Sequence, residues 1–165
     1  MATPSAVIAA FRTVIETQLG YLAIFPRQNA PRPEKPYATV DMTPIMRIGD
    51  RDEMRHVSGT TYEYVGLRKA TVQIEIFGDN SLDDAQRLQM LLRTNSVNSG
   101  LLSDSEIAIV SFGNVTDLDT LLDDQYEQRA LLEIEIAYNV SVQSDEGCIE
   151  TVEVTDQTLD PDEQF

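Results

Sequence analysis

The sequence of 165 residues has no tryptophan, one cysteine, one histidine and only 12 basic residues against 28 acidic ones, a formal net charge of -16. A basic face that grips nucleic acid is therefore not expected, because phosphate binding depends on neutralisation by lysine and arginine. The same shortage argues against a polybasic membrane anchor. No run of about 18 apolar residues is present that could span a bilayer. Cys148 has no partner in the chain, so no intramolecular disulfide can form and a reducing compartment is the better expectation.

The motifs of phosphate, hydrolase and zinc chemistry are missing too: the chain has no glycine-rich phosphate cradle, no G-x-S-x-G elbow, no H-E-x-x-H and no paired cysteines. His56 stands in a polar stretch without a catalytic arrangement around it, and we expect it at the surface. The aspartates at 117–124 do not form a calcium loop, because Leu121 and Leu122 fall where polar ligands and a glycine are needed. These absences predict a protein that works by binding other macromolecules and has no enzymatic activity, cofactor or metal. A small-molecule-binding domain and an enzyme with an unfamiliar carboxylate site remain alternatives.

Charge is divided unevenly along the chain. Residues 1–75 hold nine basic and eight acidic residues, whereas residues 76–165 hold three basic and 20 acidic ones. The last 22 residues, Ser144–Phe165, carry eight acids and no base. Such segments are usually solvated, and an acidic arm that docks on a basic partner is the alternative. We expect one domain over residues 1–155 and an acidic tail over 156–165.

Two helices are predicted from local signals. Thr3 can cap a first helix that begins at Pro4, shows apolar residues at helical spacing, and ends at Gly20. Ser81 and Asp84 resemble a capping box before a second apolar stripe, which we expect to fade near 95–100. Between these helices, four prolines at positions 26–36 predict an extended linker.

Strands are predicted where apolar and polar residues alternate: at 37–43, continuing past a bulge at Pro44 to Ile48, and at 70–77, 107–112 and 132–142, with a short edge strand at 149–154. The polar stretch 49–66 is long enough for a hairpin tip or an arm. The resulting order, α-β-β-α-β-β, predicts an α+β two-layer sandwich. We expect a mainly antiparallel sheet of four to five strands with both helices on one face.

Three segments resemble a known family. The first is Gln28–Pro33 with Lys35–Thr39, which is similar to the proline-rich entry segment of bacteriophage neck or tail terminator proteins, also called tail completion proteins. The second runs through Val115–Leu118, Thr120–Asp123 and Glu127–Ala130 before the last long strand. The third, Gly147–Val154, resembles the family's closing strand, although Cys148 stands where an apolar or aromatic residue is expected.

The resemblance implies a structural virion protein that forms a hexameric ring at the head-proximal end of the tail tube. Such a ring would stop tube polymerisation, join the tail to neck or adaptor proteins, and in a contractile phage touch the last sheath ring. Genome DNA would pass through its lumen without specific contact, and the ring would assemble in the cytoplasm of the host bacterium. A head-tail stopper or adaptor of the neck is the nearest alternative.

On this reading, the proline-rich segment and the 49–66 stretch are the projecting parts through which subunits or partners meet. The candidate interface residues are Pro31, Arg32, Pro33, Tyr37, Arg51 and Arg55. Arg32 and Tyr37 have a plainer alternative role, which is to anchor a loop that crosses the core. An acidic lumen would let DNA slide without sticking. The candidate lumen acids are Asp117, Asp119, Asp123, Asp124, Glu133 and Glu135.

Overall fold

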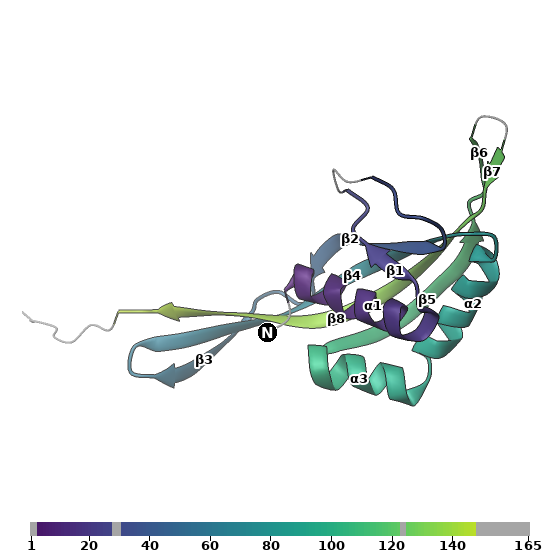
Figure 1. Cartoon of the computed structure of the whole chain (residues 1–165). Coiled ribbons are helices and arrows are strands. Elements are labelled where there is room, and N and C mark those ends of the chain that lie inside the picture. The colour runs from purple at the N-terminus through teal and green to yellow at the C-terminus, as the bar shows by residue number, and fades with distance from the viewer. Residues whose placement is uncertain (1–2, 28–30, 123–124, 148–165) are drawn as a thin grey trace, which may run out of the picture.

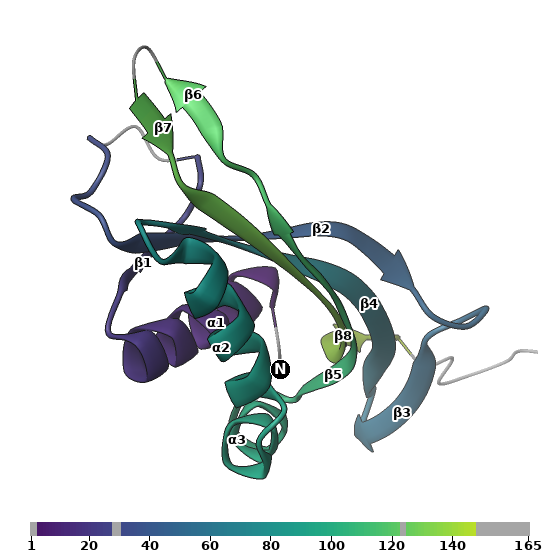
Figure 2. The same cartoon turned by 90° about the vertical axis from the view of Figure 1, so that its right-hand side faces the viewer.

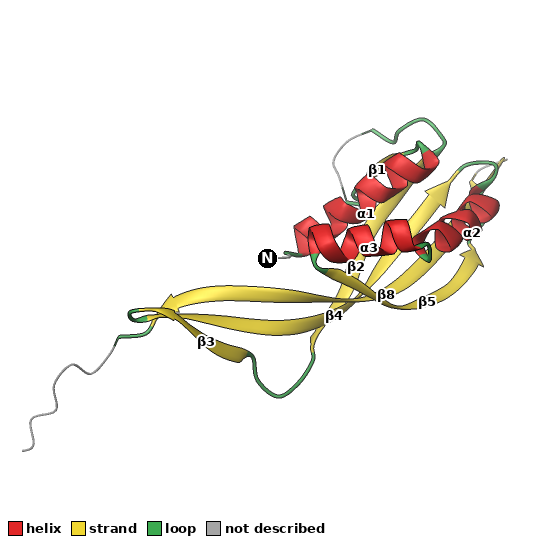
Figure 3. Cartoon of the chain, turned by 90° about the horizontal axis from the view of Figure 1, so that it is seen from below, coloured by secondary structure: helices red, strands yellow, loops and turns green. Residues whose placement is uncertain are grey.

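The computed structural model describes residues 3–27, 31–122 and 125–147. Within them the helices are α1 (Pro4–Leu19), α2 (Ser81–Leu92) and α3 (Asn95–Ser105). The strands are β1 (Leu22–Ile24), β2 (Tyr37–Arg47), β3 (Glu53–Ser58), β4 (Thr61–Phe77), β5 (Ile107–Asp117), β6 (Thr120–Leu122), β7 (Gln125–Glu127) and β8 (Arg129–Asp145). All three helices lie on one face of the main sheet (Figures 1 and 3). The predicted α+β class with helices on one face is confirmed.

The main sheet has six strands in the order β1-β2-β4-β8-β5, with β3 paired to β4 beside the end of β2. Only β1 and β2 run parallel among these described strands, and the other pairs are antiparallel. Strands β4 and β8 have 17 residues each and pair without a register shift from Phe77 opposite Arg129 to Thr61 opposite Asp145. The sheet is therefore larger than the four to five strands expected, and β6 and β7 form a separate hairpin.

Helix α1 begins and ends where its local signals predict. The Thr3 side chain accepts a hydrogen bond from the backbone N–H of Ala6, and Pro4 occupies the first turn, where its missing N–H costs nothing. Gly20 adopts a left-handed conformation with φ of 73° and ends the helix. Val7, Phe11 and Ile15 form the buried stripe.

The prediction for the second helical region was wrong in two respects. Ser81 is not a cap: it lies inside α2 and is buried, and the Asp84 carboxylate instead accepts a hydrogen bond from the Tyr21 hydroxyl at 2.6 Å. The chain also does not leave helical structure after residue 95, because α3 follows α2. Its composition, rich in serine and asparagine, has low helix propensity, and burial of Leu101 in the core supplies the missing stability.

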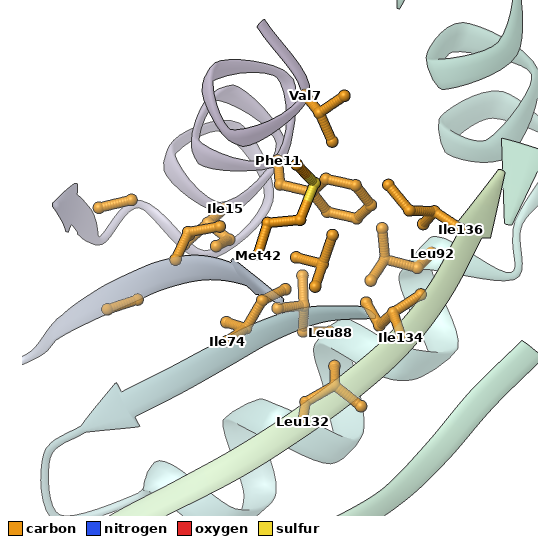
Figure 4. Close-up of a cluster of buried hydrophobic side chains, with 14 of the residues drawn as sticks. Val7, Phe11, Ile15, Met42, Ile74, Leu88, Leu92, Leu132, Ile134 and Ile136 are labelled. Carbon is orange, nitrogen blue, oxygen red and sulfur yellow. The ribbon is translucent and has the colours of Figure 1, made fainter. Parts of the chain in front are cut away.

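The core fills the space between the helices and one half of the sheet. Figure 4 shows α1 and α2 contributing side chains that meet those of β2, β4 and β8. The central buried residues are Phe11, Ile15, Val40, Ile74, Leu88, Leu92, Leu132, Ile134 and Ile136. The other half of β4 and β8 continues beyond the helices (Figure 3). We call this second half the arm, and define it as residues 45–69 and 139–147.

The arm begins at the irregularity that the proline at 44 predicts. The β2–β4 register shifts between Met42 and Ile45, and β2 then continues to Arg47. The stretch 49–66 contains β3 and the first part of β4, which pair as a hairpin. His56 lies on β3 and is exposed. The predicted strand at 149–154, Cys148 and the tail 156–165 lie outside the described residues.

Candidate assembly surfaces

The proline-rich segment, residues 31–36, is tied to strand β7, more than 90 residues later in the chain, by one buried carboxylate. Arg32 Nη1 lies 2.7 Å and Lys35 Nζ 3.1 Å from Oε1 of Glu127, whose side chain is only 7% exposed. Burial opposes ionisation of Glu127, but the hydrogen bond from Lys35 and the charge of Arg32 outweigh it and lower the pKa of this carboxyl. This segment is therefore anchored to β7, in keeping with the plainer role considered for Arg32.

A groove of about 490 Å³ lies between this segment and the sheet, and its floor is aromatic. Tyr37 and Phe77 are register partners on β2 and β4, and their rings stack with centroids 4.6 Å apart. The guanidinium groups of Arg32 and Arg129 each lie 5.8 Å from the centre of the Phe77 ring. Arg129 also pairs with Glu75 at 3.6 Å, so the cations in this groove already have anionic partners.

Tyr37, a candidate interface residue, is only 2% exposed. Its ring is part of the protein interior. Tyr37 can therefore affect binding of a partner molecule mainly by shaping the floor of the groove above it. Pro31, Arg32 and Pro33 line that groove from the outside. Their part in a subunit contact stays a prediction.

The face of the sheet without helices is polar, and it carries two of the candidate lumen acids. Because buried residues alternate along β8, Glu133 and Glu135 point away from the core, toward this face. Glu133 accepts a hydrogen bond from Gln73 Nε2 at 2.8 Å. Glu135 accepts a hydrogen bond from Ser111 at 2.6 Å and pairs with Lys69 at 3.1 Å; the Ser111 hydrogen bond and then Lys69 lower the pKa of this carboxyl. Both carboxylates are thus held in place on one surface.

The other candidate lumen acids belong to a different place. Asp119 accepts a hydrogen bond from the backbone N–H of Arg129, and Asp117 accepts one from the N–H of Asp119. These two carboxylates therefore hold the turn that leads into the β6–β7 hairpin. The structure does not bring them together with Glu133 and Glu135 in one cluster, and Asp123 and Asp124 lie outside the described residues.

The β6–β7 hairpin projects from the end of the sheet opposite the arm (Figures 1 and 2). Leu121 and Tyr126 are register partners across this hairpin. They are 57% and 73% exposed, which is unusual for large apolar side chains in a matched pair. The hairpin is therefore a second projecting element available for contact.

Arg51 and Arg55, the remaining candidate interface residues, both belong to the arm and are exposed. Arg55 pairs with Glu53 at 2.9 Å on the same strand, whereas Arg51 forms no ion pair with the described part of the chain. Beside them, Arg68 makes two hydrogen bonds to Asp52, of 2.9 and 3.0 Å. Gly66 makes room for this pair, because a Cβ there would lie 2.2 Å from Asp52 Oδ1.

Glu127 is the residue that sequence reasoning missed. It falls within a segment that supports the family resemblance, but its burial depends on Arg32 and Lys35, which are more than 90 residues earlier in the chain. No local pattern reveals such a partnership.

A further hollow of about 350 Å³ lies between α1 and α3 and is lined mainly by Val14, Val97, Leu101 and small polar side chains. Among the described residues, no group of three or more histidine, cysteine, aspartate or glutamate side chains is placed to hold a metal ion. None of the helices in the described ranges is long and apolar enough to cross a bilayer.

Comparison with known proteins gives one result. A family model described as phage neck terminator protein matches residues 5–162, which is nearly the whole chain. The match includes all three segments that carry the resemblance in the sequence. No protein of curated function matches the chain.

Proposed function

This chain belongs to the phage neck terminator family, and from that premise we propose that it forms a ring, with six subunits, that caps the head-proximal end of the tail tube. Membership makes it a structural protein of the phage tail and neck, which acts beside other tail and neck proteins. The proposed ring stops tube polymerisation, offers a surface to the neck or adaptor proteins, and in a contractile phage meets the last sheath ring. It assembles in the cytoplasm of the host bacterium.

The family match over residues 5–162 is the observation that carries this proposal. The shape of the chain supports it. A ring made by one repeated contact needs two different surfaces on each subunit, one that donates and one that accepts. The arm and the β6–β7 hairpin lie at opposite ends of the sheet and supply two such projections (Figure 2).

The helix-free face of the sheet is the surface that we propose for the lumen. It carries Glu133 and Glu135 in fixed positions, and the whole chain has a net charge of -16. Repulsion between these carboxylates and DNA phosphates would let the genome pass without binding, since no counterions are released by such a contact. We propose no catalytic role and no cofactor for any residue.

The test begins with the mass of the purified protein, measured by light scattering, and negative-stain images of the same fraction. Six chains weigh about 110 kDa, six times the 18.4 kDa of one chain. We expect either a six-fold ring with a central hole, or a monomer that forms such a ring on added tail tubes. Tubes whose ends stay bare would contradict the proposal. Binding to a portal adaptor with bare tube ends would instead indicate a stopper.

A further inference from the structure

The groove between the proline-rich segment and the sheet combines apolar walls with two cations. Phe25, Phe77 and three prolines, at positions 26, 31 and 33, line it. The guanidinium groups of Arg32 and Arg129 lie over the Phe77 ring at its floor. Arginine clusters bind acidic segments, and neighbouring aromatic rings and prolines hold the apolar side chains of the same segment. The groove therefore has the chemistry of a site for a short peptide that is both acidic and apolar.

Both arginines can donate hydrogen bonds to a further carboxylate. Arg32 is 60% exposed even though its Nη1 is bonded to Glu127. Arg129 Nη1 lies 3.6 Å from the carboxylate of Glu75, which is too far for a hydrogen bond. The buried Nε of Arg129 has no hydrogen-bond partner in the part of the chain that the structure describes. A guanidinium with unused donors at the edge of a groove is suited to receive an anion.

The local charge of the groove also favours an anionic occupant. Two basic residues and one acidic residue, Glu75, line it. Four other surface hollows are lined by more acidic than basic residues. Charges more than ~8 Å away are largely screened at physiological salt, so this local balance matters more than the net charge of the chain. An acidic segment meets attraction here and repulsion at those four hollows.

The sequence of this chain contains a segment of the required kind. Residues 156–165 lie outside the described residues, and their sequence holds four acids and no base. Leu159, Pro161 and Phe165 stand between and after these acids. The tail thus supplies carboxylates for the two arginines and apolar side chains for the aromatic and proline walls.

We infer that the groove binds the acidic tail, residues 156–165, of a second copy of this chain. The inference rests on the proposed ring and names one contact by which neighbouring subunits hold each other. Arg32 then has two roles, since it anchors the proline-rich segment through Glu127 and offers its exposed donors to the tail of the neighbour. This contact is separate from the contacts made by the arm and the β6–β7 hairpin.

The length of the chain explains why the tail comes from a second copy. Strand β8 runs from Arg129, beside the groove, to Asp145 at the other end of the molecule (Figure 1). Its residues extend about 54 Å, whereas residues 146–156 span at most ~40 Å. The first part of the tail therefore cannot return to its own groove. In a head-to-tail ring, the arm of one subunit can approach the groove of the next, which removes this limit.

The experiment measures proximity between tail and groove by cross-linking full-length chains in which Cys148→Ser removes the native thiol. One variant carries Pro31→Cys at the rim of the groove, and a second carries Gln164→Cys in the tail. The control replaces the rim cysteine by Asp104→Cys, at an exposed position of α3. Circular dichroism and negative-stain images confirm that each variant folds and assembles. Mixed variants are then treated with a short bis-maleimide, with and without tail tubes.

We expect the pair with Pro31→Cys to give at least tenfold more cross-linked dimer than the pair with Asp104→Cys. An excess of a synthetic peptide of residues 154–165 should reduce this yield. The same peptide with its acids replaced by asparagine and glutamine should not. A chain that carries both Pro31→Cys and Gln164→Cys should give a ladder of covalent multimers.

Equal yields from the two mixed pairs, in rings that still cap tubes, would overturn the inference and leave the proposed function intact. Internally linked monomers in place of the ladder would overturn the assignment to a second copy. Equal competition by the acidic and the neutral peptide would overturn the role of the arginines. A wild type that forms no ring in solution or on tubes would overturn the proposed function, and the inference with it.

Discussion

Glu127 and Arg32 are 95 residues apart in the sequence, and their side chains meet at 2.7 Å. With Lys35 as a second cation, this contact joins the proline-rich segment to β7 and so to the base of the projecting β6–β7 hairpin. The position of two surface elements therefore depends on one buried carboxylate.

Glu127→Gln should lower the free energy of unfolding by about 1–2 kcal/mol at neutral pH. The exposure of Arg32 and Lys35 keeps the effect this small, because solvent screens their charges. Urea unfolding measures the change. Glu34→Gln, at an exposed position in the same segment, is the control and should behave as the wild type.

The same carboxylate predicts a pH dependence. The pKa of Glu127 in the folded protein lies below its ordinary value of 4.5, so the unfolded chain binds a proton more readily. The stabilisation is complete above the ordinary value and is lost as the pH falls through the lower, folded-state pKa. Unfolding measured from about pH 6 to about pH 3 should show a steeper loss in the wild type than in Glu127→Gln. Equal slopes would contradict this assignment.

Two substitutions of Tyr37 distinguish a role in the stability of the fold from a role in contact with a partner. Tyr37→Phe keeps the ring stacked on Phe77 and should leave ring assembly unchanged. Tyr37→Ala should cost about 3–5 kcal/mol, because it leaves a cavity at a buried aromatic position. Urea unfolding and light scattering of both variants test this pair of expectations. Loss of assembly by a stably folded Tyr37→Phe would instead show that the hydroxyl contacts a partner.

Arg51→Glu should weaken assembly about tenfold, which corresponds to ~1.4 kcal/mol. Arg51 is exposed and has no ion pair within the described chain, so its loss should not affect folding. Light scattering at several protein and salt concentrations measures the effect, and the difference from the wild type should shrink at high salt. Arg87→Glu, at an exposed position of α2, changes the charge equally and should assemble normally.

Glu133→Lys tests the proposed lumen. In a six-fold ring it would place six cations around the channel, and we expect rings that retain duplex DNA with an affinity that falls steeply as salt rises. Gel-shift titration measures the retention. Asp104→Lys, on the exposed side of α3, makes the same change in net charge and should leave DNA unbound. Equal retention by both variants would count against the helix-free face as the lumen.

Several parts of the fold follow from short-range signals. Thr3, Pro4 and Gly20 set the limits of α1 through interactions within a few residues, and the alternation in β4 and β8 predicts their buried faces. Helix α3 was missed because its stability comes from Leu101 in the core, which local propensity does not contain. Asp84 was taken as half of a capping box because its actual partner, Tyr21, is 63 residues away.

The candidate surface residues were likewise predicted in part from the sequence and corrected in part by the structure. Sequence reasoning placed Arg51 and Arg55 on a projecting stretch, and the structure puts both on the arm. It grouped Asp117 and Asp119 with Glu133 and Glu135 by charge alone. The structure separates them, because alternation directs the glutamates to the helix-free face whereas the aspartates hydrogen-bond to backbone N–H groups in a turn.

By itself, the sequence determined the α+β class, the acidic character and the resemblance that the family match confirms. These depend on composition, periodicity and local motifs, which need no knowledge of distant partners. Only the tertiary structure decided that β4 and β8 extend beyond the helices. That depends on where α1, α2 and α3 end relative to two 17-residue strands. The uncovered face of the arm exists because the helical layer is shorter than the sheet it packs on.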